Sequence, residues 1–282
     1  VNCLSTLNNS LIAGTNNGLF SLDPHQKRFI PVYTEYFEGL NVNEIFQSSH
    51  GDIYISTFNG LVVFRSGQQQ PALYVNNPLN TLSISHNTVN KVIESPEGDI
   101  FVGSLGGLQK FDPVSGFFYS LPETGPDYFK LSNQFINTLY SDKEGNIWIG
   151  TDKGGVNKFN VWQNQFGYYT HDPDNTNSIN VNTINSIYKE KNFLWIGTAG
   201  GGLNMVNLVS GLIKHYTYNI NNASSISNDY VTSFARDSKG SLWVGTWGGG
   251  LNHVITQGEN VQIERITSTT PGIRNTLINT FV

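Results

Sequence analysis

The side chains best suited to catalysis or metal binding are few and scattered in this sequence. The six histidines stand at positions 25, 50, 86, 171, 215 and 253, without the spacing of metal ligands, so surface or turn roles are expected for them. The stretch "DPDNTN" at 172–177 is similar to the beginning of a calcium loop, but it lacks the glycine at the sixth position and the acidic residue at the twelfth, where Thr183 stands. We therefore predict no metal site and no cofactor.

Nucleophiles and phosphate-binding loops are equally hard to place. No serine or cysteine stands in a nucleophile frame, and spacing marks out no pair of carboxylates. The glycine-rich stretches "TAGGGLN" and "TWGGGLN" are followed by strand patterns, not by a helix, which argues against phosphate binding. The single cysteine, Cys3, excludes an internal disulfide and a cysteine-based zinc site. We predict no catalytic residue and interpret these glycines as turn residues.

Composition and charge exclude further classes of function. The 282 residues carry a net charge of −5, so no basic surface for nucleic acid or for an anionic membrane is expected. No apolar run approaches the ~18 residues of a membrane span, and Val1 opens directly in a strand-like pattern. We expect any targeting or membrane segment to lie outside this sequence.

One block of sequence recurs six times. The copies are "SLIAGTNNGLFS" (10–21), "DIYISTFNGLVV" (52–63), "DIFVGSLGGLQK" (99–110), "NIWIGTDKGGVN" (146–157), "FLWIGTAGGGLN" (193–204) and "SLWVGTWGGGLN" (241–252). A second block, an aliphatic residue usually followed by asparagine, precedes each copy and starts near 1, 42, 89, 136, 184, 231 and 278, in steps of 41, 47, 47, 48, 47 and 47 residues. A period of this length predicts units that bury their cores against one another.

Each repeat has the pattern of four short strands. Apolar residues alternate at spacing two, and turn residues separate the runs. In residues 136–170 we expect strands at "INTLYS", "IWIGT", "VNKFN" and "FGYYT", with Asp142 capping the first turn and Gly145 at positive φ. Short connections make the four an antiparallel meander, and a ring of such sheets is a β-propeller. We predict one all-β propeller domain over 1–282, with six full blades and a seventh beginning at 278.

Large side chains recur at one position of the second strand. Its occupants are Ile12, Tyr54, Phe101, Trp148, Trp195 and Trp243. We predict that the five aromatic ones pack between neighbouring blades, because buried aromatic side chains contribute most to such cores. The asparagine of each first strand is expected to face trapped water.

The motifs "IWIGTDKGGVNKFN", "LWIGTAGGGLNMVN" and "LWVGTWGGGLNHV", together with links such as "DPDNTNSINVNTI", resemble the two-component regulator propeller repeat. The resemblance covers essentially the whole chain and is weaker in the first two repeats, where Ser56 replaces the usual glycine. It implies the periplasmic sensor part of a hybrid two-component histidine kinase, cut from a longer sensor. It further implies an oligosaccharide ligand, control of genes for glycan use, and partners in the remaining domains and in a dimer mate.

The turns after the second strands should lie on one end of the ring, with the links between blades. There Trp247 has Asn16, Phe58, Leu105, Asp152 and Ala199 as counterparts. Sugars present apolar C–H faces beside hydroxyls, so the candidate ligand-binding residues are Trp247, Phe58, Asn16 and Asp152. Alternatively, Trp247 covers its own turn or packs on another domain or a dimer mate. Two other functions remain open: a streptogramin-lyase-like propeller enzyme, and a scaffold that binds proteins.

Overall fold

The computed structural model describes residues 1–7, 10–68, 70–121, 130–160, 165–238, 240–258, 260–266 and 278, without the side chains of 165–167 and 257. The chain divides into two compact units, each described here by itself. Unit 1 contains Val1–Ile149 and Lys158–Gly167, and unit 2 contains Gly150–Asn157 and Tyr168–Phe281.

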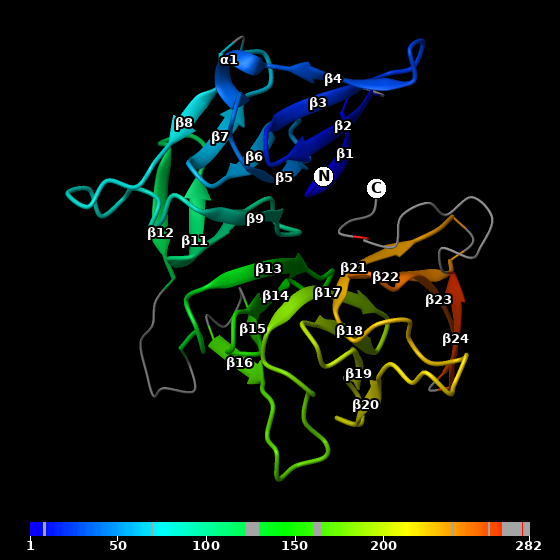
Figure 1. Cartoon of the computed structure of the whole chain (residues 1–282). Coiled ribbons are helices and arrows are strands. Elements are labelled where there is room, and N and C mark those ends of the chain that lie inside the picture. Colours follow the sequence, from blue (N-terminus) through cyan, green and yellow to red (C-terminus); the bar gives the residue numbers. More distant parts are fainter. Residues whose placement is uncertain are drawn as a thin grey trace. The chain divides into compact units, whose positions relative to one another are not determined.

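Each repeat folds into a four-stranded antiparallel sheet whose strands follow one another in sequence order (Figure 1). The first three blades are β1 Cys3–Leu7, β2 Ser10–Thr15, β3 Gly18–Asp23 and β4 Arg28–Val32; β5 Val42–Gln47, β6 Ile53–Thr57, β7 Gly60–Phe64 and β8 Ala72–Tyr74; and β9 Val89–Glu94, β10 Ile100–Ser104, β11 Gly107–Asp112 and β12 Phe117–Ser120. The other three are β13 Ile136–Ser141, β14 Asn146–Thr151, β15 Val156–Asn160 and β16 Gln165–Tyr169; β17 Ile184–Glu190, β18 Phe193–Thr198, β19 Leu203–Asn207 and β20 Ile213–Tyr216; and β21 Val231–Arg236, β22 Leu242–Thr246, β23 Gly250–Gln257 and β24 Asn260–Ile266.

The predicted fold class is confirmed: the protein is an all-β propeller with six four-stranded blades. The predicted turn after β13 is also found, since Gly145 has φ 77° and the Asp142 carboxylate accepts the main-chain N–H of Glu144 at 3.0 Å. One element was not predicted. A single helical turn, α1 Thr34–Phe37, lies in the link between the first two blades and buries Phe37. No helix in the described ranges is long and apolar enough to cross a membrane.

The glycine of the "GT" motif lets neighbouring blades approach. A Cβ atom built on Gly103 would lie 2.7 Å from Ile136, the first residue of the next blade, and one built on Gly197 would lie 2.5 Å from Val231. Such distances are far below van der Waals contact, so a larger residue would require the facing side chains to shift. Blade 2 departs from this pattern because Ser56 is buried there, with a hydroxyl that finds no hydrogen-bond partner among the described residues.

The first-strand asparagines connect consecutive blades. We expected their amides to face trapped water, but in four blades the amide nitrogen donates to the main-chain carbonyl that begins the next blade. The pairs within unit 1 are Asn2 to Val42 at 3.0 Å, Asn43 to Val89 at 2.7 Å and Asn90 to Ile136 at 2.7 Å, and in unit 2 Asn185 donates to Val231 at 2.8 Å. A hydrogen bond from a partly buried amide to the first carbonyl of the next blade ties the two blades together, so the asparagine helps to specify how they join.

Residue 278 takes the position of a blade-starting residue beside blade 6. Its carbonyl accepts the hydroxyl of Thr232, the residue that replaces asparagine in β21. A Cβ on Gly245 would lie 2.6 Å from the Ile278 side chain, as at the other junctions. The rest of the predicted seventh strand, 279–282, lies outside the described residues, so a seventh blade stays a prediction.

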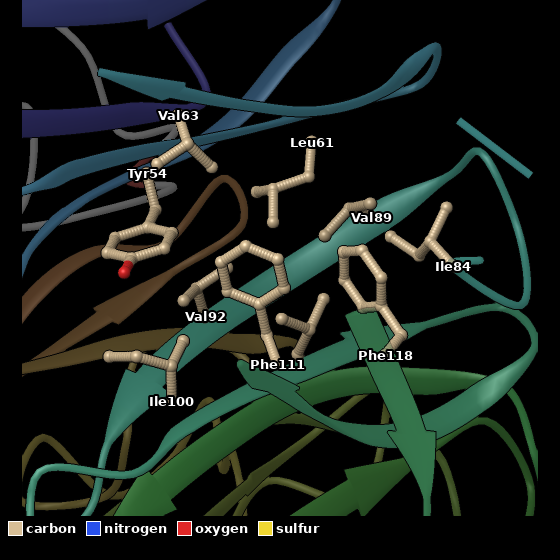
Figure 2. Packing of buried hydrophobic residues seen from close by; sticks show 10 residues of the cluster. Tyr54, Leu61, Val63, Ile84, Val89, Val92, Ile100, Phe111 and Phe118 are labelled. Carbon is tan, nitrogen blue, oxygen red and sulfur yellow. The ribbon is translucent and has the colours of Figure 1, made fainter. Parts of the chain in front are cut away.

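Aromatic side chains of the second strand fill the junctions between blades. Figure 2 shows Tyr54 of blade 2 directed toward Phe111 of blade 3, and the two rings meet edge-on with centroids 6.1 Å apart. Phe101 lies 6.5 Å from Phe159 of the next blade in the same way. In unit 2, Trp195 belongs to one buried cluster with residues of blade 6. These three side chains are buried, as predicted.

The remaining two tryptophans of the series differ from each other. Trp148 is buried, its indole N–H donates to the Asp142 carboxylate at 2.8 Å, and the Lys158 ammonium lies 5.3 Å from its ring. Trp243 is only partly buried, which corrects our prediction of burial between blades. Its ring stacks on His253 of the adjacent strand in its own blade at 4.7 Å.

The links between blades have a repeated local structure of their own. In "DPDNTNSI", Asp172 accepts the N–H of Asp174 and Asn175 accepts the N–H of Asn177, each through its side chain. The same pair of turns recurs at Asn77 with Asn80 and at Asn219 with Asn222. Each link contains a fully buried isoleucine after these turns, at 84, 179 and 226. The stretch that is similar to a calcium loop is therefore a pair of Asx turns anchoring an isoleucine in the core.

Candidate functional site

The turns that follow the second strands are built alike in all six blades, and we call them the rim turns. In each, the Thr or Ser hydroxyl that ends the second strand donates, over 2.8–3.4 Å, to the carbonyl of the glycine that starts the third strand or immediately precedes it. That glycine has positive φ, for example 72° at Gly202, where a Cβ would lie 2.4 Å from the Tyr216 carbonyl oxygen. The hydroxyl and the glycine hold each turn in one conformation.

The residue after the Thr or Ser lies beside the residue that precedes its own blade's first strand. Its main-chain N–H donates to that residue's carbonyl in four rim turns: Phe58 to Asn41 (3.2 Å), Leu105 to Thr88 (3.2 Å), Ala199 to Thr183 (3.0 Å) and Trp247 to Tyr230 (2.9 Å). Each of these turns therefore presents a pair of side chains, one from the turn and one from the link. Each of these four rim turns thus fixes two side-chain positions.

The aromatic pair of blade 6 is the most exposed of these arrangements. Trp247 is 51% exposed and Tyr230 is 42% exposed, and their ring centroids are 6.1 Å apart at 58°. Sequence reasoning selected Trp247 but missed Tyr230. The signal that could have found it is its place immediately before the repeated first-strand block, where Asn41, Thr88 and Thr183 stand in other blades.

Asp152 forms a polar pair on the rim turn of blade 4, which belongs to unit 2. The hydroxyl of Thr183, in the link before blade 5, donates to its carboxylate at 3.3 Å. Lys153 follows with φ 61° and an exposed side chain, so this turn presents both charges to solvent. A carboxylate held in this way can accept hydroxyl hydrogens from a polar ligand.

The two candidates in unit 1 also lie on rim turns. The Asn16 carboxamide oxygen accepts from Asn2 at 2.8 Å, and Phe58 is 48% exposed. Within the described ranges, the hydrogen bonds of the polar candidates go to first-strand or link residues, not to another candidate. The structure thus confirms that the four occupy equivalent turns, while their joint role in one site stays a prediction.

The groups on the rim turns are suited to binding a ligand. Half-exposed aromatic faces, a carboxamide and a carboxylate suit an uncharged ligand that combines hydroxyl groups with apolar C–H faces. Among the residues that the structure describes, no three His, Cys, Asp or Glu side chains gather closely enough to hold a metal ion.

Two of the repeats match a known family of sequence repeats. Residues 130–153 and 225–248 match the two component regulator propeller, and each range ends in a rim turn. The chain carries two-component regulator propeller repeats. Curated proteins contain no match to the sequence.

Solved structures with the same fold include bacterial surface proteins. The extracellular domain of the one-component system BT4673 of B. thetaiotaomicron has a TM-score of 0.65 at 19% identity, covering 100% of this chain and 42% of that one. The extracellular domain of the hybrid two-component system BT3049 of the same organism has a TM-score of 0.51 at 20% identity, covering 100% and 41%. PorZ of the Porphyromonas gingivalis type-IX secretion system has a TM-score of 0.72 at 15% identity, covering 99% and 43%. The chain thus spans about two fifths of these structures, and the likeness is one of fold.

Proposed function

We propose that this chain is the ligand-sensing propeller of an extracytoplasmic sensor, part of a longer hybrid two-component histidine kinase and response regulator. The regulator propeller repeats support this class, and so does the fold shared with extracellular domains of one-component and two-component systems. The chain is the binding part and performs no catalysis itself. It works in the periplasm and acts on the remaining domains of its parent protein and on a dimer mate.

The proposed ligand is an oligosaccharide released from a polysaccharide, and its binding controls transcription of the genes for using that glycan. The observation that carries this proposal is the exposed pair Trp247 and Tyr230 on a rigid turn. Pyranose rings present C–H faces that pack on aromatic rings, while their hydroxyls bond to planar polar side chains. Asp152 and Asn16 supply such groups at equivalent turns.

The test is a titration of the chain with a panel of glycan fragments, followed by tryptophan fluorescence and melting temperature. We expect at least one fragment to raise the melting temperature and to be released unchanged. Trp247→Ala and Tyr230→Ala should each weaken its binding about tenfold or more, as loss of an aromatic anchor does. Phe117→Ala is the matched control, because Phe117 is also a partly exposed aromatic residue but lies on the fourth strand β12.

Each other outcome points to a different function. Cleavage of a fragment, seen by chromatography, would indicate a propeller enzyme. A partner protein captured by the chain, without any response to glycans, would indicate a scaffold. A fragment that binds wild type, Trp247→Ala and Tyr230→Ala equally would remove this rim turn from the site.

A further inference from the structure

An apolar cavity of about 440 Å³ lies between the first two blades, entirely within unit 1. Blade 1 contributes Ile12, Leu19 and Ser21 to its wall, and blade 2 contributes Ile53, Ile55 and Phe64. None of the described residues that line it carries a charge. The volume falls within the range of small-molecule sites, which is roughly 300–1,000 Å³.

The cavity exists because blade 1 lacks the aromatic side chain found in every other repeat. Ile12 stands where Tyr54, Phe101 and Trp195 fill the corresponding junctions. Its partner across the hairpin is also small: Ile12 pairs with Ser21, whereas Trp195 pairs with Met205. Two smaller side chains side by side leave a space that larger side chains fill in the other blades.

The opposite wall keeps the aromatic residue that normally receives this ring. Phe64 pairs with Ile53 in blade 2 as Phe111 pairs with Ile100 in blade 3. At the second junction, Tyr54 meets Phe111 edge-on, as Figure 2 shows. At the first junction Phe64 lines the cavity instead. Within the described part of unit 1, no second-strand aromatic ring meets Phe64 there, and its ring partners are instead Tyr33, Tyr36 and Phe37 of the link after blade 1.

The mouth of the cavity is aromatic and partly open to solvent. Tyr33 lines it, is 53% exposed, and lies 5.0 Å from the Phe64 ring. Tyr36, on α1, approaches the same ring at 6.3 Å. Tyr33 has φ 52°, which is unusual for a residue other than glycine and fixes the backbone at this edge. Hydroxyl groups of Ser10 and Ser21 add polar positions to the lining.

We infer that the cavity between blades 1 and 2 binds a small uncharged aromatic molecule, whose ring takes the place of the missing second-strand aromatic and packs against Phe64. The neutral lining excludes charged ligands, since an ion buried there would lose its hydration without compensation. A polar substituent of the ring bonds to the serine hydroxyls. The site is separate from the rim turns and does not depend on the proposed sensing of oligosaccharides.

The test uses N-phenyl-1-naphthylamine, an uncharged aromatic probe whose fluorescence rises in apolar sites, with indole as competitor. Wild type is expected to bind one probe per chain and to release it to indole. Ile12→Trp restores the side chain of the other repeats and should weaken probe binding at least tenfold while raising the melting temperature by about 2 °C or more. Ser21→Met introduces the residue type of position 205 and should also weaken probe binding. It replaces Ile12→Trp as the test variant if Ile12→Trp does not fold.

Val114→Trp is the matched control, because it adds a tryptophan at a position that is 95% exposed in the turn between β11 and β12. It should bind the probe as wild type does. Wild type that fails to bind the probe, even if Ile12→Trp is more stable, would show that the cavity is only a packing gap and overturn the inference. Equal binding by wild type, Ile12→Trp and Ser21→Met would place the probe elsewhere and overturn it too. Trp247→Ala should leave probe binding unchanged, which separates this result from the oligosaccharide test.

Discussion

Replacing Trp195 by alanine tests the central claim that second-strand aromatics hold neighbouring blades together. Trp195 is 1% exposed, its ring lies 6.3 Å from that of Tyr216, and it belongs to a buried cluster that includes Leu242 and Val244 of blade 6. Burying ~150–250 Å² at ~25 cal/mol per Å² contributes ~4–6 kcal/mol as an upper estimate. Measured large-to-small core substitutions at tryptophan cost ~3–5 kcal/mol. We expect Trp195→Ala to lower the free energy of unfolding by ~3–5 kcal/mol.

The measurement is urea unfolding followed by far-ultraviolet circular dichroism, because the substitution itself changes the tryptophan fluorescence. Trp247→Ala is the control: the same residue type is removed from a half-exposed position, so a loss below ~1.5 kcal/mol is expected. Trp195→Phe introduces the residue type that stands at position 101. It should lower the free energy of unfolding clearly less than Trp195→Ala does. Equal midpoints for Trp195→Ala and Trp247→Ala, with unchanged urea dependence, would refute the assigned packing.

Two further predictions concern close approach and ionisation. Gly197→Ala places a methyl group 2.4 Å from the Ser186 hydroxyl and 2.5 Å from Val231, so the free energy of unfolding should fall by ~1–3 kcal/mol; an unchanged urea midpoint would contradict the approach of blades 5 and 6. Burial, with the nearby Glu44 carboxylate, raises the pKa of the Cys3 thiol from 9.0 to about 12, so the folded protein binds more protons between these values. Cys3 therefore makes the protein less stable as pH rises from about 9 to 12, by up to ~1.4 kcal/mol per pH unit. Cys3→Ala should flatten this pH dependence of the free energy of unfolding in urea titrations. The burial of Cys3 would be disproved if, at pH 8, the thiol of the folded protein reacted with a disulfide reagent as fast as it does in urea.

The architecture of each blade could be predicted because its determinants are local. Alternating apolar residues, turn glycines and a period near 47 residues specify four strands that pair with their neighbours in sequence. Trp148 and Trp195 could be assigned to the core for the same reason, since their register within the strand decides which face they occupy. The rim position of Trp247 followed from strand direction alone.

The junctions between blades depend on contacts between residues about 47 positions apart. The sequence was insufficient to predict these contacts. Its pattern gave Trp243 the same role as Trp195, but Trp243 stacks on His253 of its own blade and stays partly exposed. The asparagine of the repeat was recognisable in sequence, whereas its partner, the first carbonyl of the next blade, was not.

The functional features divide in the same way. The sequence by itself determined the repeat, the blades and the turn that presents Trp247, because these follow from contacts within one hairpin. Only the tertiary structure brought Tyr230 against Trp247 and left a cavity beside Ile12. The aromatic pair and the cavity both depend on which side chains from separate segments meet. A cavity forms where the neighbouring side chains are too small to fill the space. Periodicity reports which way a side chain points, while packing decides what it touches.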